Sequence, residues 1–327
     1  MAKKALVTGI TGQDAAYLSR LLLEKGYEVY GAHRRSSTLN LWRLEELGIE
    51  ERVKLVCMEL TDLASIIQTV KRIQPDEIYN LAAQSFVGVS FEEPVHTSDV
   101  NGLSVARLLD AVRLFSPHSR FYQASTSELF GRAQTSPLTE TSPFHPRNPY
   151  AVAKLYGHWT SINYRESYNL FTAAGIMFNH ESPLRGPEFV SRKITSSFAT
   201  VKMGMKECVE LGNMDSKRDW GFAGDYVDAM WRMLQQDAGD VYLLATGRMT
   251  SIRNFVELAA QSLDVELHWE GKGIDEIGRD RLTGKIWVKI TRNFTAPPKP
   301  NWSSAIPPRP RPNLAGNLKC RLNEWLK

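Results

Sequence analysis

The fold is decided at the start of the chain, by Lys4-Ala5-Leu6-Val7-Thr8-Gly9-Ile10-Thr11-Gly12-Gln13-Asp14-Ala15. Residues 4–7 are mostly apolar and β-prone, a tight glycine turn follows, and residues 15–25 have helical spacing that ends at Gly26. The amides of such a turn and the N-terminus of the helix can hold a pyrophosphate. A purely structural turn is the alternative, but the position of this Gly-x-x-Gly-x-x-Ala motif directly after the first strand favours dinucleotide binding.

The alternation of strand and helix continues beyond this turn. Strand patterns occur at 27–32, 53–57, 77–82, 120–124 and 172–178, and helical patterns at 63–73, 103–115, 150–168, 226–236 and 252–263. Alternating strands and helices predict an α/β fold with a doubly wound, Rossmann-type parallel sheet. After residue 179 the chain loosens into loops rich in Pro, Arg and Gly, so we expect a smaller C-terminal substrate domain over the carboxyl edge of the sheet.

Composition restricts the class of protein further. The 327 residues are 43% hydrophobic and 23% charged, and no apolar run approaches the roughly 18 residues that cross a bilayer, so we expect a cytoplasmic protein without a membrane partner. Cys57, Cys208 and Cys320 lack ligand spacing, which predicts no metal site. Residues 285–327 hold nine Lys/Arg and one acid, Glu324, but no recognisable nucleic-acid-binding module, so no nucleic-acid partner is expected.

The end of the second predicted strand indicates which dinucleotide is bound. It runs into His33-Arg34-Arg35-Ser36-Ser37 and lacks the acidic residue that bonds the ribose 2′-hydroxyl in NAD sites. Two guanidiniums and two hydroxyls suit a 2′-phosphate, because arginine pairs bidentately with phosphate. A solvated basic loop is the alternative. We expect the cofactor NADP, with Arg34, Arg35, Ser36 and Ser37 around its 2′-phosphate.

A candidate catalytic set lies further along. Tyr150 and Lys154 are four residues apart and share one helical face, with Asn148-Pro149 as a plausible cap and first turn. A lysine ammonium and a nearby nicotinamide can lower the pKa of a tyrosine. Ser125-Thr126-Ser127-Glu128 follows a predicted strand and therefore emerges at the carboxyl edge. Alone, Glu128 would be a helix-start carboxylate, but beside a threonine and a Tyr/Lys pair it is a candidate proton carrier.

Together these motifs resemble those of the GDP-mannose 4,6-dehydratases, a family within the extended short-chain dehydrogenase/reductases. The resemblance covers residues 3–271. It rests on the Thr-Gly-x-x-Gly turn, Asn80-Leu81-Ala82-Ala83-Gln84-Ser85, Ser125-Thr126-Ser127-Glu128, Tyr150-x-x-x-Lys154, Asn179-His180-Glu181-Ser182-Pro183 and Arg218-Asp219-Trp220. It implies a hydro-lyase that converts GDP-mannose to GDP-4-keto-6-deoxy-mannose and regenerates its NADP. It also implies a homodimer or homotetramer, because the family uses the Arg34-Arg35 loop at a subunit contact.

The resemblance assigns roles to residues. Tyr150 would deprotonate the sugar 4-hydroxyl, Thr126 would hydrogen-bond that oxygen, Lys154 would hold the ribose, and Glu128 would carry the C5 proton to the departing C6 hydroxyl. The residues implied to contact cofactor are Gly9, Ile10, Thr11, Gly12, Gln13, Asp14, Glu59, Leu60, Asp62, Leu81, Ala82, Ala83, Gln84, Ser85, His96, Lys154, His180 and Arg185. Those implied to contact the GDP-sugar are Ser85, Glu128, Asn179, Lys193 and Arg218.

Two local departures from the family pattern bear on the cofactor. Glu59-Leu60-x-Asp62 replaces the usual Asp-Leu-x-Asp, and His96 stands where tyrosine is frequent. Both are expected to change contacts to adenine or nicotinamide slightly. We expect residues 1–178, rejoined by 214–246, to form the NADP-binding domain, and residues 179–213 with 247–327 to form the nucleotide-sugar-binding domain.

A larger departure lies in residues 294–320. Seven of the sixteen prolines fall between 297 and 312, and Asn293-Phe294-Thr295-Ala296-Pro297-Pro298 stands where the family has a Phe-Arg-Pro-type segment that closes the pocket. We interpret the segment as a compensated frameshift, which predicts a weakened GDP subsite; genuine divergence is the alternative.

Two other functions stay open at this point. A nucleotide-sugar epimerase or 4-ketoreductase of the same family shares the fold, cofactor and Tyr/Lys pair but does not require Glu128. The atypical tail makes a non-catalytic cofactor-binding homologue the second alternative.

Overall fold

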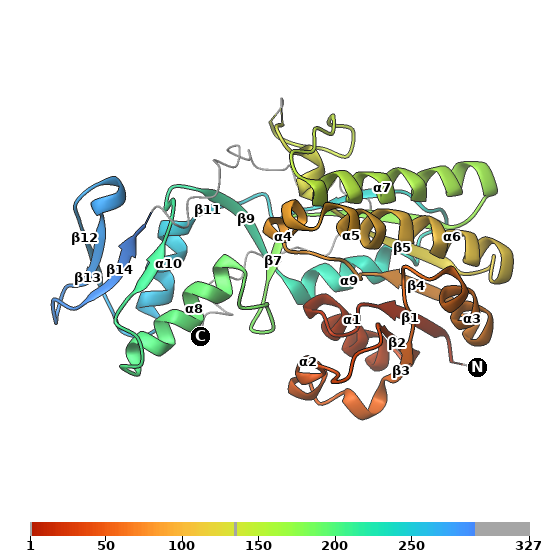
Figure 1. The fold of residues 1–327 in the computed structure, drawn as a ribbon, viewed down its shortest axis with the longest axis horizontal. Coiled ribbons are helices and arrows are strands. Elements are labelled where there is room, and N and C mark those ends of the chain that lie inside the picture. The colour runs from red at the N-terminus through yellow and green to blue at the C-terminus, as the bar shows by residue number, and fades with distance from the viewer. Residues whose placement is uncertain (1, 134–135, 292–327) are drawn as a thin grey trace.

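The computed structural model describes residues 2–133 and 136–291, and its largest element is a seven-stranded parallel sheet of order β10-β6-β5-β4-β1-β2-β3 (Figure 1). The strand order reverses between β1 and β4, and a crevice at the carboxyl ends of such strands is where doubly wound folds bind ligands. The strands are β1 (Lys4–Thr8), β2 (Glu28–His33), β3 (Lys54–Cys57), β4 (Glu77–Asn80), β5 (Arg120–Thr126), β6 (Thr172–Met177) and β10 (Val241–Leu244).

Helices cover both faces of this sheet (Figure 1). Alternate strand residues point to opposite faces. Tyr122 belongs to one buried cluster with Leu18 of α1 and Met230 of α9, whereas its neighbour Phe121 belongs to another, with Val70 of α3 and Leu109 of α6. Helix α7 lies beside α6 on this second face. The helices are α1 (Gln13–Glu24), α3 (Leu63–Ile73), α6 (Ser104–Phe115), α7 (Pro149–Tyr168) and α9 (Ala223–Met233).

A smaller part of the molecule packs around its own apolar core, which includes Phe198, Trp220, Phe255 and Trp287. It contains a three-stranded sheet, β11-β9-β7, and a four-stranded sheet, β12-β13-β14-β8. Its elements are β7 (Asn179–Glu181), α8 (Val190–Lys202), β8 (Val209–Leu211), β9 (Lys217–Phe222), β11 (Met249–Ser251), α10 (Ile252–Gln261), β12 (Leu267–Glu270), η4 (Gly273–Asp275), β13 (Ile277–Asp280) and β14 (Ile286–Ile290). The remaining short helices are α2 (Trp42–Glu46), η1 (Glu50–Arg52), α4 (Val87–Glu92), α5 (Pro94–Ser98), η2 (Asp99–Leu103) and η3 (Ser127–Phe130).

The predicted α/β fold with a doubly wound parallel sheet and a smaller C-terminal part is confirmed. The helical pattern at 63–73 coincides with α3. Strand β4 ends at Asn80, two residues before the predicted end, because the amides of Leu81 and Ala82 donate to the Thr8 hydroxyl and not to a neighbouring strand. The domain boundaries stay a prediction. The frameshift interpretation concerns residues 294–320, which lie outside the described residues.

Among the described residues, no helix combines the length and the apolar character needed to cross a membrane.

Candidate active site

The glycine turn joins β1 to α1. Gly9 has a φ of +69°, and a Cβ at this position would lie 2.8 Å from the Cα of Ala82, so both the backbone angle and the close approach of the β4 loop require glycine. The Gly12 amide donates to the Gly9 carbonyl at 2.9 Å, and no side chain caps α1 at Gly12. The first amides of α1 can therefore donate to an anion placed before the helix.

A buried polar network fixes the strand ends beside this turn. The Thr8 hydroxyl donates to Asn80 Oδ1 at 2.9 Å and accepts from the amides of Leu81 and Ala82 at 3.0 Å each. Asn80 Nδ2 in turn donates to Gln123 Oε1 at 2.9 Å, so the ends of β1 and β4 are tied to the middle of β5. Sequence reasoning missed Thr8 and Gln123, although Thr8 ends β1, where a polar side chain is a usable signal.

Asp14, in the first turn of α1, pairs with His180 on β7. His180 Nε2 lies 2.8 Å from Asp14 Oδ2 and its Nδ1 lies 2.7 Å from the Phe178 carbonyl oxygen. Since both partners only accept, the imidazolium, which donates from both nitrogens, fits this setting. Burial alone would raise the pKa of Asp14, but the His180 charge and hydrogen bond outweigh it and lower that pKa to about 2. Conversely, Asp14 raises the pKa of His180 against the effect of burial.

This pair joins the two parts of the molecule next to the glycine turn. Gln13 Nε2 donates to the His180 carbonyl oxygen at 3.3 Å, and Ser182 Oγ donates to Gln13 Oε1 at 2.7 Å. The imidazole stacks on Tyr226 with ring centroids 4.5 Å apart. His180 also neutralises the one acidic side chain in the first turn of α1, which would otherwise repel an anion bound there.

Arg43 is a site residue that sequence reasoning missed. Its Nη1 donates to the Thr11 carbonyl at 2.8 Å and its Nε to the Leu184 carbonyl at 2.7 Å. It thus holds the glycine turn against the segment that follows β7. Arg185, in that segment, lies 3.1 Å from Glu181 and 3.6 Å above the Phe189 ring.

Several of the predicted cofactor residues are exposed, and others have side chains that are hydrogen-bonded or packed within the protein. Arg34, Arg35, Ser36 and Ser37 are all exposed after β2, as are Ser85 and His96. The Glu59 carboxylate accepts from Thr61, and Asp62 caps α3 through the Ala64 amide at 2.9 Å. Leu60 and Ile10 are buried, as apolar packing residues are. Asn101 holds the Gln84 backbone with two hydrogen bonds of 2.8 Å, and Ala83 is half-buried.

The four candidate catalytic side chains meet at the carboxyl end of β5. The Tyr150 hydroxyl is hydrogen-bonded to the Thr126 side chain. Lys154, 4% exposed, donates from Nζ to the Ala124 carbonyl at 3.0 Å, and its Nζ lies 6.0 Å from the centre of the Tyr150 ring. Glu128 lies on η3, directly after β5, and its amide donates to the Thr126 hydroxyl at 3.2 Å. The spacing in sequence therefore corresponds to one cluster in space.

Burial dominates the electrostatics of Tyr150 and Lys154 in the protein alone. Burial raises the pKa of Tyr150 to about 12, which the Thr126 hydrogen bond only partly offsets, and burial lowers the pKa of Lys154 to about 8. The lowered tyrosine pKa was predicted for a site that also holds a nicotinamide, and it stays a prediction. It would need the additional positive charge of an oxidised nicotinamide ring.

Two polar side chains from other elements lie close to the Glu128 carboxylate. Asn148, which caps α7 by accepting from the Ala151 amide at 2.7 Å, donates from Nδ2 to Glu128 Oε2 at 3.0 Å. Arg218 on β9 is close enough that the carboxylate raises its pKa, although burial lowers that pKa overall. Asp219 steadies β9 here by accepting from the Thr246 and Gly247 amides at 2.9 and 2.8 Å. Asn148 was predicted only as a helix cap, and its bond to Glu128 was missed.

The other predicted substrate residues lie in the smaller part. Asn179 is half-buried at the start of β7, in register with Trp220 of β9. Lys193 is half-buried on α8, and its pKa is lowered first by burial and then by the charge of Lys206. Lys193 thus lies near Lys206, and the charge of Glu210 acts on its pKa in the opposite direction.

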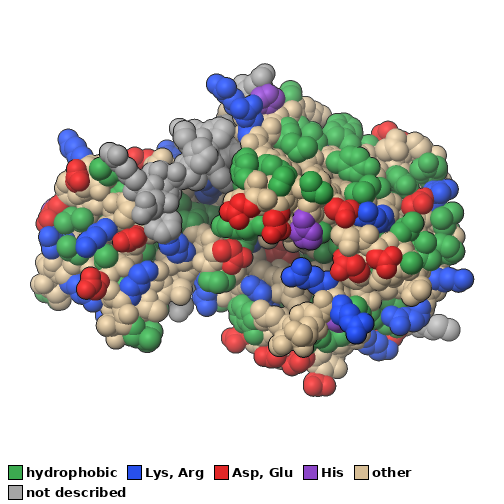
Figure 2. Space-filling view, in the orientation of Figure 1, with side chains coloured by type: hydrophobic (Ala, Val, Ile, Leu, Met, Phe, Trp, Pro, Cys, Tyr) green, Lys and Arg blue, Asp and Glu red, His purple; other side chains and the backbone are tan. Residues whose placement is uncertain are grey.

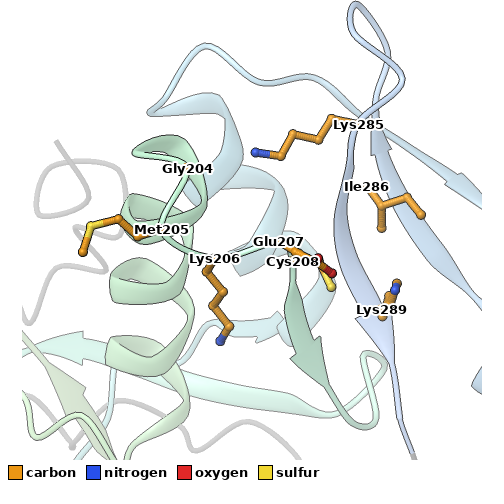
Figure 3. A pocket seen from close by; sticks show the side chains of 8 residues that line it. All are labelled: Gly204, Met205, Lys206, Glu207, Cys208, Lys285, Ile286 and Lys289. Atoms are coloured by element: carbon orange, nitrogen blue, oxygen red, sulfur yellow. The ribbon is translucent and has the colours of Figure 1, made fainter.

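A surface hollow lies between the segment after α8, β8 and β14 (Figure 3). Lys206, Lys285 and Lys289 line it, but Figure 3 shows the first two amines pointing in different directions. Lys285 Nζ donates to the Val201 carbonyl at 3.0 Å and Lys206 Nζ to Ser197 Oγ at 3.4 Å. Because these ammonium groups do not converge, we assign no ligand to the hollow.

The fold and this cluster define a class of protein. A doubly wound sheet with a glycine turn after β1, and a Tyr-x-x-x-Lys pair on a helix beside a strand-end threonine, are typical of the extended short-chain dehydrogenase/reductases. Solved structures have the same fold. A UDP-N-acetylglucosamine 4-epimerase from Methanobrevibacter ruminantium (TM-score 0.81, 21% identity) covers 99% of this chain and 96% of its own. DesIV from Streptomyces venezuelae, a dTDP-glucose 4,6-dehydratase with NAD bound (TM-score 0.80, 19% identity), covers 99% and 95%.

Sequence relatives identify the family. The sequence model described as GDP-mannose 4,6 dehydratase matches residues 6–306, past residue 271, where the resemblance was expected to end. A GDP-mannose 4,6-dehydratase of Yersinia enterocolitica is 52% identical over 282 residues, which is 84% of this chain and 76% of the relative. A human GDP-mannose 4,6 dehydratase is 50% identical over 301 residues, 90% and 81% of the two chains. The chain belongs to the GDP-mannose 4,6-dehydratase family.

Proposed function

We propose that the protein removes water from GDP-mannose to give GDP-4-keto-6-deoxy-mannose. The observation that carries the proposal is the position of Glu128, next to Thr126 and Tyr150 at one strand end. Its family relatives carry the name of this reaction. An epimerase needs only the Tyr/Lys pair, whereas loss of water needs a further group that moves a proton at carbon, which a positioned carboxylate does.

We propose NADP as the cofactor. The residues fit a dinucleotide, because a Cβ at Gly9 would fill the place where the turn and the β4 loop approach each other, and the start of α1 is uncapped. Bound NADP would accept a hydride from C4 of the sugar and supply one at C6. The exposed Arg34 and Arg35, with Ser36 and Ser37, would pair with the 2′-phosphate, which NAD lacks.

The protein's residues would then handle protons and orientation. Tyr150 takes the proton of the 4-hydroxyl while Thr126 donates a hydrogen bond to the same oxygen. Lys154, anchored on Ala124, contributes positive charge and holds the ribose. Glu128 removes the C5 proton, which the new 4-ketone makes acidic, and transfers it to the departing 6-hydroxyl. C5 regains a proton that balances the one taken from O4, so the net loss is water.

The smaller part would hold the nucleotide sugar. We propose that Asn179, Lys193 and Arg218, with Ser85, contact the GDP-sugar, since basic side chains pair well with a diphosphate. The expected cofactor domain comprised residues 1–178 and 214–246. Because Met214 and Trp220 pack in the core of the smaller part, we propose that residues 214–222 belong with the substrate domain.

We also propose a homo-oligomer. Large apolar side chains are exposed on α5 and α7, including Val95 at 81%, Val152 at 55%, Tyr156 at 51% and Trp159 at 54%. Figure 2 shows hydrophobic side chains gathered over this region. Contiguous exposed apolar surface of this kind favours association, and a second copy of the chain is the partner that the family resemblance implies.

Incubation of the protein with GDP-mannose and NADP tests the function. We expect one equivalent of water to be lost per sugar, detected by mass spectrometry, and a 4-keto product that borohydride reduces. NADP should be neither consumed nor reduced at the end. An interchange of sugar epimers without loss of mass would contradict the proposal, as would cofactor binding without any change in the sugar.

A further inference from the structure

Helix α7 is fastened to strand β5 by three side chains spaced four residues apart. Tyr150 is hydrogen-bonded to the Thr126 side chain, Lys154 donates to the Ala124 carbonyl at 3.0 Å, and His158 Nδ1 lies 2.8 Å from Ser125 Oγ. These bonds end on three consecutive residues, 124–126. The first two involve the proposed catalytic groups, and the third lies directly behind them.

His158 and Ser125 are both enclosed, with 1% and 2% of their surface exposed. Burial lowers the pKa of His158 to about 4, so its ring is neutral at ordinary pH and takes part through a single fixed hydrogen bond. A phenylalanine ring would fill this buried position without the free-energy cost of burying polar nitrogens. A histidine is therefore suited to the position because of its hydrogen bond. The match of imidazole and hydroxyl therefore specifies one register between α7 and β5.

The His158 ring also contacts the segment that supports Glu128. Phe144 lies edge-on to it with ring centroids 5.2 Å apart, and Phe144 packs on Phe130, two residues after Glu128, at 5.3 Å. Four residues after Phe144, Asn148 donates to the Glu128 carboxylate. The buried ring of His158, on α7, thus contacts both the strand and the loop that present the cluster.

We propose that His158 is a positioning residue, which through Ser125 holds Tyr150 and Lys154 in register with Thr126. The positioning role follows from the contacts themselves, and only the reaction that it affects rests on the proposed function. A displacement of catalytic side chains by the order of 1 Å can cost about 100-fold in rate. A small rotation of α7 about the His158 contact, two turns from Tyr150, can produce such a displacement.

The chain offers a matched control. Thr172 on β6 donates from Oγ1 to the Ser161 carbonyl of α7 at 2.7 Å, and both residues are fully buried. This bond also fastens α7 to the sheet, but it lies further from Tyr150 along the helix. Thr172→Val therefore removes a buried bond between helix and sheet without touching the register at the catalytic end.

The test compares Ser125→Ala, His158→Phe, His158→Asn and Thr172→Val for kcat, KM and Tm. We expect Ser125→Ala and His158→Phe to lower kcat by about tenfold or more, with KM for GDP-mannose changed less than about twofold. His158→Asn, whose amide can occupy the place of Nδ1, should recover most of the loss. Thr172→Val should lower Tm by a similar amount but keep kcat.

A second readout does not depend on turnover. In protein labelled with ¹³Cζ-tyrosine, the Tyr150 NMR signal, assigned with Tyr150→Phe, should shift in Ser125→Ala and His158→Phe but not in Thr172→Val.

Unchanged kcat and an unchanged NMR signal in Ser125→Ala would overturn the proposal even if His158→Phe failed to fold. A loss of kcat in Thr172→Val equal to that in Ser125→Ala would also overturn it. Wild-type protein that leaves GDP-mannose unchanged, yet shows the selective shift, would refute the proposed function and leave the positioning role standing.

Discussion

The buried pair of Asp14 and His180 makes a quantitative prediction about stability. Replacing Asp14 by Asn removes the charge but keeps the size of the side chain. The pKa of Asp14 falls from 3.8 to about 2 on folding, and at about 1.4 kcal/mol per unit this corresponds to roughly 2 kcal/mol of stabilisation. Since 22% of the carboxylate is exposed, this figure is an upper value. With an unfolding entropy of about 2 cal/mol/K per residue, it corresponds to a loss of roughly 3 °C in Tm.

The loss should depend on pH in a defined direction. Because the folded pKa of Asp14 is lowered, its contribution is present above pH 3.8 and disappears as pH falls towards 2. Because the folded pKa of His180 is raised above 6.5, its contribution is present below pH 6.5 and disappears as pH rises through that higher value. The difference between wild type and Asp14→Asn should therefore be largest between about pH 4 and 6.5 and smaller at pH 9.

Thermal unfolding at pH 5.5 and pH 9 measures this difference. Asp62→Asn is the matched control, because this aspartate also begins a helix, caps it through the Ala64 amide, and can be replaced by asparagine with little cost. An Asp14→Asn variant with the same Tm loss at both pH values, or with none at pH 5.5, would refute the assignment of a charged pair.

Three further outcomes follow from the site. Glu128→Gln should abolish loss of water while C4 oxidation persists, seen as a lasting absorbance of reduced cofactor at 340 nm; unchanged dehydration would remove this residue from the mechanism. Gly9→Ala should abolish cofactor binding in a fluorescence titration, because its Cβ would lie 2.8 Å from the Ala82 Cα, whereas Gly204→Ala shares a positive φ but meets no atom within 4 Å and should bind normally. Tyr150→Phe should reduce kcat by about 10²–10⁴-fold with cofactor affinity retained, and a smaller effect would point to another base.

The sequence predicted the parts of the fold that depend on local periodicity. The turn at Gly9 and the pairing of Tyr150 with Lys154 follow from spacing, and in the structure these residues occupy a strand-to-helix turn and one helix face. It did not predict the strands β12 to β14, which are short and pair mainly with one another. Hairpins of this kind depend on contacts that only the folded chain brings together.

In the site, too, local features were predicted from the sequence and tertiary contacts were not. Asn148 and Arg43 were not recognised as site residues, because their partners, Glu128 and the Thr11 carbonyl, become neighbours only through the tertiary fold. The pKa of Tyr150 in the protein alone does not follow from spacing, because burial in the folded chain raises it. Side-chain identity predicts which groups can react, whereas their protonation depends on the surrounding protein.

The fate of the hydrogen on C4 of the sugar tests the account most directly. With GDP-mannose deuterated at C4 and unlabelled NADP in ordinary water, the account expects the label in the product's C6 methyl group, one deuterium per molecule, by ²H NMR. Deuterium retained at C4, or released to the solvent with an unlabelled methyl group, would contradict a hydride that leaves C4 and returns at C6 within one active site.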